Sequence, residues 1–176
     1  MAKEVEIPFV ISYDFDGALA PGNMQEHSFI PALNMKHEEF WRRSNADAVA
    51  QEGDPILLYM HNMLREAQHA RIPVKKENFG QHGAKVSLFA GAEGWFDRVN
   101  AEGARLGLKV RHFIISSGLR EIIQGTKIAR YFERIYASGY FYDENGVATT
   151  PALAINYTNK TQYLFRINKG ALDVGD

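Results

Sequence analysis

The 176-residue sequence contains no cysteine, which excludes disulfides, thiolate metal ligands and cysteine nucleophiles. It also lacks a dominant charge, because 20 basic side chains face 21 acidic ones and leave a formal net charge of -1. Such a chain has no general electrostatic attraction for nucleic acid or an anionic membrane. No apolar stretch approaches the roughly 20 residues of a membrane helix, and the polar first residues do not resemble a signal peptide. These absences favour a cytoplasmic protein that binds neither nucleic acid nor membranes.

Hydrophobic residues make up 45% of the chain and charged residues 23%, proportions that are typical of a globular protein with a packed core. The length fits one domain, or a small core that carries an insertion. We find no internal repeat and no low-complexity segment.

The most informative stretch runs from Phe9 to Leu19 and reads FVISYDFDGAL. Its first residues are apolar and β-branched, which predicts a buried strand. Asp14 and Asp16 then follow two positions apart. Alternate residues of an extended chain point to the same side, so both carboxylates can converge where open α/β sheets bind their ligands. On these residues alone, a solvated acidic turn explains the pattern as well as a functional site does.

The rest of the chain alternates between helical and extended patterns. Helical patterns cover residues 26–81, with one helix over 37–51 and a second that begins at Asp54 and Pro55, an acidic N-cap followed by proline. Later elements are predicted as a helix over 93–106, strands over 109–115, 134–137 and 153–157, a hairpin at Asn145-Gly146 and a helix over 160–168. This alternation predicts a parallel sheet with right-handed crossovers.

Chemically useful side chains follow the predicted core elements in chain order. Asp14 and Asp16 follow the first strand, Ser116 follows the second, and Lys160 opens the last helix. Neighbouring parallel strands end on one edge of a sheet, so these residues can meet around a phosphoryl group. One carboxylate can act as nucleophile and the other as general acid and base. A hydroxyl and a lysine can hold the phosphate, and Mg²⁺ can bridge it to a carboxylate.

On these motifs the sequence resembles the haloacid dehalogenase superfamily, and within it the phosphoserine-phosphatase-like members. The first motif of that family, Asp-x-Asp-Gly-Thr, corresponds to DFDGA at residues 14–18. The second, an apolar strand that ends in serine or threonine, corresponds to FIISSGLR at residues 113–120, and the third is a lysine at a helix start, here Lys160. The resemblance covers nearly the whole chain.

The resemblance implies an α/β fold: a Rossmann-like parallel sheet with a helical cap inserted after the first strand. The core would comprise residues 1–20 and 86–176, and the cap residues 21–85. The helical stretch is longer than an ordinary loop, as an inserted cap requires.

The resemblance also implies an activity, that of a Mg²⁺-dependent phosphomonoester hydrolase acting on a small phosphorylated metabolite through an aspartyl-phosphate. Asp14 would be the nucleophile and Asp16 the general acid and base. The same two residues would hold Mg²⁺, Asp14 through its carboxylate and Asp16 through its backbone carbonyl. Ser116, Ser117 and Lys160 would bind the substrate phosphate. Phosphoserine, a nucleotide and a sugar phosphate all remain open as substrates.

Two departures from the family pattern point to alternatives. Ala18 replaces the usual threonine, and the acidic fourth motif, with the strand that precedes it, is missing. Without that strand the segment Phe9–Tyr13 becomes an apolar edge, and such edges recruit other strands. We therefore expect either a fragment of a longer hydrolase that is inactive alone, or a homodimer that covers the edge. The alternative function is a catalytically impaired binding or regulatory domain.

Other polar residues receive simpler interpretations. The six histidines show no metal-ligand spacing; His27, with Asn23, ranks highest because both follow the nucleophile loop. Arg120 is expected to form a salt bridge on its helix, and Lys127 is a weaker rival to Lys160. The segment at 75–77, Lys-Lys-Glu, is predicted to be a solvated turn.

Overall fold

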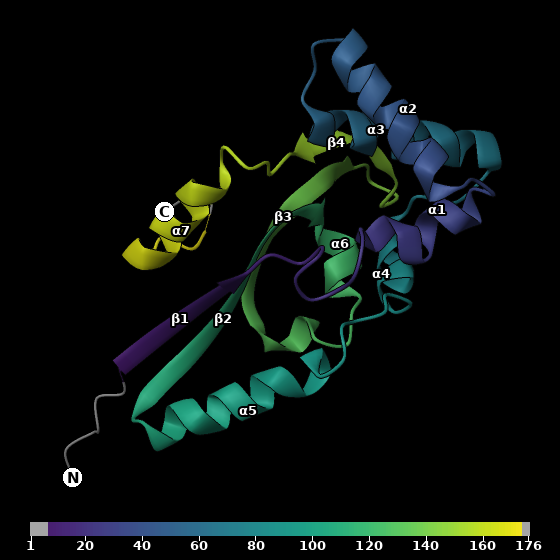
Figure 1. The fold of residues 1–176 in the computed structure, drawn as a ribbon. Coiled ribbons are helices and arrows are strands. Elements are labelled where there is room, and N and C mark those ends of the chain that lie inside the picture. Colours follow the sequence, from purple (N-terminus) through teal and green to yellow (C-terminus); the bar gives the residue numbers. More distant parts are fainter. Residues whose placement is uncertain (1–6, 174–176) are drawn as a thin grey trace.

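The computed structural model describes residues 7–173 of the chain. Four strands form one sheet in the order β1-β2-β3-β4 (Figure 1). Strands β1 (Ile7–Tyr13), β2 (Leu108–Leu119) and β3 (Phe132–Tyr142) run parallel, and β4 (Ala148–Leu153) runs antiparallel to β3. The predicted α/β class with a parallel core is therefore confirmed.

Helices fill the connections between the strands. Five helical segments lie between β1 and the long helix α5 (Ala92–Arg105): η1 (Met24–His27), α1 (Phe29–Ala32), α2 (His37–Ala50), α3 (Pro55–Ala70) and α4 (Lys76–Gly83). The remaining described segments are α6 (Arg120–Gln124), η2 (Ala129–Tyr131) and α7 (Lys160–Lys169). No helix within residues 7–173 combines the length and apolarity needed to cross a bilayer.

Local sequence signals set several of these boundaries. The Asp54 carboxylate accepts the backbone N–H of Ile56 at 2.8 Å, so α3 begins where the acidic N-cap predicted. Gly146 adopts a positive φ of 71°, and its N–H donates to the Asp143 carbonyl at 3.0 Å. This tight turn joins β3 to β4, which confirms the predicted hairpin.

The two faces of the sheet are covered by different helices. On one face Phe96 of α5 meets Tyr13 and His112, with ring centroids 5.6 and 5.1 Å apart. On the other face Tyr163 and Ile167 of α7 belong to a cluster with residues 113 and 115 of β2. The sheet therefore lies between α5 and α7. Lys160 of α7 contacts Asp14, which directly follows β1.

The helices that follow β1 share a hydrophobic core with the sheet. The ring of Phe79 in α4 stacks on Tyr140 of β3, with centroids 5.4 Å apart. The Tyr140 hydroxyl donates to the Met60 carbonyl of α3 at 2.8 Å. Helices α4 and α6 approach so closely that a Cβ on Gly83 would lie 2.0 Å from the Ile122 carbonyl oxygen. The helical segment is thus tightly packed against the strands.

The structure corrects three expectations. The first strand is exposed rather than buried, with Ile7 62% and Phe9 49% accessible. Among the described residues it pairs with β2 alone, which confirms the apolar edge predicted from the missing fourth motif. The strand predicted over 153–157 is wrong: β4 begins directly after the hairpin turn and ends at Leu153. Residues beyond it turn instead, because the Asn156 side chain accepts the N–H of Thr158 at 3.0 Å. The solvated turn at 75–77 is in fact the start of α4.

Candidate active site

Asp14 and Lys160 form the centre of the site. Asp14 follows the last residue of β1, and Lys160 is the first residue of α7. The Lys160 ammonium donates to Oδ2 of Asp14 at 2.5 Å, while Oδ1 accepts the N–H of Phe15 at 2.8 Å. Both side chains remain partly accessible, Asp14 at 45% and Lys160 at 27%. The sequence prediction that these two residues meet is borne out by this contact.

Asp16 lies deeper than Asp14. Phe15 between them is fully buried in the core, and Gly17 turns the chain with a φ of 73°. The Oδ1 atom of Asp16 accepts the backbone N–H of Met24 at 2.8 Å, which ties the first motif to η1. Asp16 is therefore held in place by backbone from the helical segment that follows.

The environment of Asp16 favours its protonated form. Burial raises the pKa of the carboxyl from its usual value near 3.8 to about 7. The Met24 N–H and the Lys160 charge act in the opposite direction, while the charges of Asp14 and Glu26 add to the increase. A carboxyl that titrates near neutral pH can both donate and accept a proton, as a general acid and base must.

The two serines of the second motif are engaged within the protein. Ser116 is fully buried, and its hydroxyl oxygen accepts the N–H of Gly118 at 3.0 Å. The carbonyl of Ser117 accepts the hydroxyl of Tyr59, which reaches over from α3, at 2.7 Å. Both serines lie near the end of β2, as predicted. Their role as phosphate ligands stays a prediction.

Gly118 links the second motif to the first. A Cβ at this position would lie 2.0 Å from Cε of Met24 and 3.0 Å from Oδ2 of Asp16. Only a residue without a side chain lets this end of β2 approach the Asp16 carboxylate so closely. The site is therefore assembled from the ends of β1 and β2 and the start of α7. Met24 of η1 contacts it directly.

Sequence reasoning missed the residues that the helical segment contributes. Glu26 of η1 accepts hydrogen bonds from Asn23 and from the Trp41 indole, both at 2.6 Å. Tyr59 and Met24 contact the two motifs directly, and neither belongs to a pattern that marks a site. Asn23 does lie by the nucleophile loop, where it holds Glu26.

His27 joins two loops instead. Its Nδ1 atom accepts the N–H of Ser87 at 3.2 Å, and its Nε2 atom donates to the carbonyl of Pro21 at 2.8 Å. Lys127 forms its salt bridge with Glu93 at 3.2 Å, so Lys160 and not Lys127 pairs with Asp14. Arg120 bridges to its neighbour Glu121 at 3.4 Å, as expected.

The residues that the sequence assigned to Mg²⁺ fit the ion in kind. The Asp14 carboxylate and the Asp16 backbone carbonyl are hard oxygen donors, which Mg²⁺ prefers. Within residues 7–173 no group of three or more histidine, aspartate or glutamate side chains could hold a metal.

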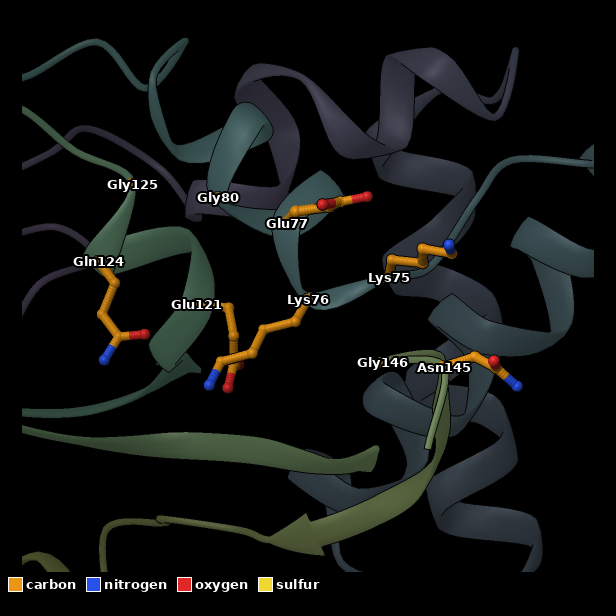
Figure 2. A pocket seen from close by; sticks show the side chains of 9 residues that line it. All are labelled: Lys75, Lys76, Glu77, Gly80, Glu121, Gln124, Gly125, Asn145 and Gly146. Atoms are coloured by element: carbon orange, nitrogen blue, oxygen red, sulfur yellow. The ribbon is translucent and has the colours of Figure 1, made fainter. Parts of the chain in front are cut away.

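A cavity of about 470 Å³ lies apart from this site (Figure 2). It is enclosed by the start of α4, by α6 and by the β3–β4 turn, and Lys76, Glu121 and Asn145 are among the residues that line it. None of its lining residues belongs to the five predicted site residues Asp14, Asp16, Ser116, Ser117 and Lys160. The carboxylate of Glu121 is buried; its Oε1 atom accepts from Arg120 at 3.4 Å, whereas its Oε2 atom is buried without a hydrogen-bond partner among the described residues.

Comparison with known proteins places the fold. No protein-family model matches the chain. It is 26% identical over 195 residues to an uncharacterized protein of Borreliella burgdorferi, a match that covers 97% of this chain and 68% of that protein. Among solved structures, it superposes on a HAD-family hydrolase of Salmonella enterica serovar Typhi with a TM-score of 0.65 and 18% identity. It also superposes on the structure of a phospho-aspartyl intermediate analogue of phosphoserine phosphatase, with a TM-score of 0.63 and 14% identity.

The chain therefore has the fold of the haloacid dehalogenase hydrolases. Its fold is also similar to that of phosphoserine phosphatase, in line with the resemblance noted in the sequence. The superposition on the Salmonella hydrolase covers 92% of this chain but only 51% of that protein. The superposition on the phosphoserine phosphatase covers 97% of this chain and 76% of that protein. The chain thus spans about half the length of the first of these proteins.

Proposed function

We propose that the chain is a Mg²⁺-dependent phosphomonoester hydrolase that acts through an aspartyl-phosphate intermediate. The observation that carries this proposal is the contact between Asp14 and Lys160 beside a carboxyl, Asp16, whose pKa lies near 7. These groups supply a nucleophile, a positive charge and a proton donor at one edge of the sheet. The fold that they occupy is the fold of solved phosphatases.

In the first step an Asp14 carboxylate oxygen attacks the substrate phosphorus, and the bond from phosphorus to the ester oxygen breaks. Protonated Asp16 donates its proton to the leaving oxygen, which departs as an alcohol. In the second step Asp16 takes a proton from a water molecule whose oxygen attacks the same phosphorus. Inorganic phosphate leaves and the Asp14 carboxylate is restored.

The remaining residues hold charge and position. Lys160 offsets the negative charge of Asp14 and of the entering phosphate. Ser116 and Ser117, near the end of β2, would bind phosphate oxygens. The Asp14 carboxylate and the Asp16 carbonyl would hold Mg²⁺, which supplies the positive charge that lets an anionic nucleophile approach an anionic ester.

The helical residues 21–85 would act as the cap that selects a small phosphorylated metabolite. In the structure this segment packs on the site through Met24 and Tyr59, which contact Asp16 and Ser117. Solved neighbours of this fold include a substrate-bound phosphoserine phosphatase, so phosphoserine is the first substrate to test.

The test is an assay of phosphate release from phosphoserine and from p-nitrophenyl phosphate, with and without Mg²⁺. We expect Mg²⁺-dependent release that Asp14→Asn abolishes, and a phosphorylated Asp14 in rapidly quenched samples by mass spectrometry. The Borreliella relative, of which this chain covers 68%, is assayed beside it. Release that persists in Asp14→Asn contradicts the assigned nucleophile.

A second function, phosphate binding without turnover, is favoured by one observation. The Ser116 hydroxyl is fully buried and engaged with the N–H of Gly118. Activity in the longer Borreliella relative but not in this chain would mark the chain as an inactive portion of a hydrolase. Inactivity of both, together with calorimetric binding of inorganic phosphate that Lys160→Met removes, would support the binding or regulatory domain.

A further inference from the structure

The cavity between α4, α6 and the β3–β4 turn has a lining without large apolar side chains (Figure 2). Two lysines, two glutamates, two side-chain amides and three glycines line it. Its volume of about 470 Å³ lies within the range of small-molecule sites. A polar lining does not suit a hydrophobic ligand. The opposite charges balance, so a simple anion would meet the glutamates and a simple cation the lysines.

Glu121 is the unsatisfied group at this cavity. Its side chain is only 2% exposed, and its contact with Arg120 is long, at 3.4 Å. Its Oε2 atom is buried without a hydrogen-bond partner among the described residues. A buried carboxylate oxygen in this condition is unfavourable unless a donor reaches it. Glu121 therefore marks a place where a ligand that donates hydrogen bonds would be stabilised.

Lys76 is the charged lining residue that faces Glu121. Figure 2 shows its side chain extending toward the end of Glu121, whereas the side chains of Lys75 and Glu77 extend away from it. The ion pair that Glu121 forms is with Arg120, and Lys76 forms none within the described part of the chain. Lys76 is also exposed. Its side chain can therefore change rotamer to admit a ligand without any movement of the backbone.

We propose that this cavity binds a short zwitterion of the amino-acid class, with its ammonium on Glu121 and its carboxylate on Lys76. The ammonium supplies the donor that Oε2 of Glu121 lacks. The carboxylate pairs with the Lys76 ammonium at the surface. A ligand that carries both charges adds no net charge to a lining whose own charges balance. The site is separate from Asp14, so binding does not require phosphatase activity.

The test is a calorimetric titration of the full 176-residue chain with glycine and with β-alanine. These two probes carry the same charged groups at different separations. We expect at least one of them to bind with a dissociation constant of about 1 mM or below. Acetate and methylamine each keep one of the two charges of glycine, and each should bind about 10-fold more weakly or not at all.

Matched variants test the two contacts. Glu121→Gln preserves the shape of the side chain and should raise the dissociation constant about 10-fold or more. Glu77→Gln removes the same charge from a side chain that extends away, and should leave binding unchanged. Lys76→Met should weaken binding about 3-fold, because this charge is exposed, and Lys75→Met should not. Circular dichroism reports on folding, and Lys76→Met still tests the proposal if Glu121→Gln fails to fold.

Nuclear magnetic resonance locates the bound probe. The side-chain amide signals of Gln124 and Asn145, which line the cavity, should shift during the titration. Asp14→Asn should bind the probe as the wild type does. The proposal is overturned if neither zwitterion binds, if acetate or methylamine binds equally well, or if Glu121→Gln and Lys76→Met both leave the affinity unchanged. Shifts confined to residues 14–17 would place the probe at the predicted phosphatase site and overturn it as well.

Discussion

Lys160 and Asp14 lie 146 positions apart in the chain, yet the ammonium nitrogen of one is 2.5 Å from a carboxylate oxygen of the other. The contact brings the start of α7 to the tip of β1. Both side chains are partly exposed, so the ion pair contributes roughly 1 kcal/mol or less to stability. The main effect of the ion pair is instead on the electrostatics of the site.

Replacing Lys160 by methionine should therefore separate activity from stability. We expect phosphate release to fall about 100-fold, the effect of removing one charge-stabilising donor, while the unfolding free energy changes by about 1 kcal/mol or less. Steady-state kinetics and urea denaturation measure the two quantities. Lys127→Met, which breaks only the bridge to Glu93, is the control and should keep full activity. Equal activity in the two variants would contradict the assignment.

Asp16 should make stability depend on pH in a particular direction. Its pKa rises from near 3.8 to about 7 on folding, so between these values the folded chain binds more protons than the unfolded chain. The unfolding free energy therefore falls as pH rises through this window, by at most about 4 kcal/mol from this group. Asp16→Asn should remove that contribution, so its stability relative to wild type should increase between pH 4 and pH 8. A stability difference that is the same at every pH would show that Asp16 titrates normally.

The same carboxyl should shape the pH dependence of the reaction. Asp16 must be protonated to donate to the leaving oxygen, so the rate for an alkyl phosphate should decline as pH rises above about 7. A substrate such as p-nitrophenyl phosphate, whose leaving group needs no proton, should decline much less. Initial rates on the two substrates over the same pH series provide the comparison. Parallel profiles would remove Asp16 from the proton-donating role.

Gly83 should be intolerant of any side chain, whereas Gly80, on the same helix, should not. A Cβ on Gly83 would meet the Ile122 carbonyl at 2.0 Å, and backbone cannot move aside. We expect Gly83→Ala to lower the unfolding free energy by about 2–3 kcal/mol. A Cβ on Gly80 comes no closer than 4.0 Å to the atoms around it, so Gly80→Ala should be neutral or stabilising by up to about 1 kcal/mol. Thermal or urea unfolding compares the two; similar losses would mean that α4 and α6 are not in close contact.

Tyr59→Phe tests the contact between the helical segment and the second motif. The substitution leaves the Ser117 carbonyl without the hydroxyl that donates to it, which should cost about 1–2 kcal/mol of stability. Tyr157→Phe, at an exposed position, should cost nothing measurable. Chemical denaturation of both variants is the measurement, and an unchanged Tyr59→Phe would argue that the hydroxyl has another partner in solution.

Much of the fold was predictable because local signals fixed it. The N-cap at Asp54 and the turn at Gly146 each act over a few residues, and each lies where the sequence predicted. The placement of Asp14 and Lys160 was predictable for a different reason. Parallel strands bring their tips to one edge, which explains why Asp14 lies beside the end of β2. Lys160 follows the antiparallel strand β4, so its contact with Asp14 was predicted from the third motif and not from strand order.

Other features depend on tertiary contacts that leave no mark in the sequence. Nothing in the pattern around Tyr59 or Met24 shows that they contact the motifs. The Ser116 hydroxyl is buried at the irregular end of β2, where it accepts the N–H of Gly118. The apolar composition of β1 predicted burial, and only the missing fourth motif indicated that the strand lies at an exposed edge.

The two tryptophans of the chain offer a way to watch its halves separately. The Trp41 indole is hydrogen-bonded to Glu26 in the helical segment, and the Trp95 indole to the Tyr13 hydroxyl beside the sheet. Each fluorophore therefore reports on a different region of the molecule. Since both regions share one hydrophobic core, single-tryptophan variants should lose their native emission together, as one cooperative unit.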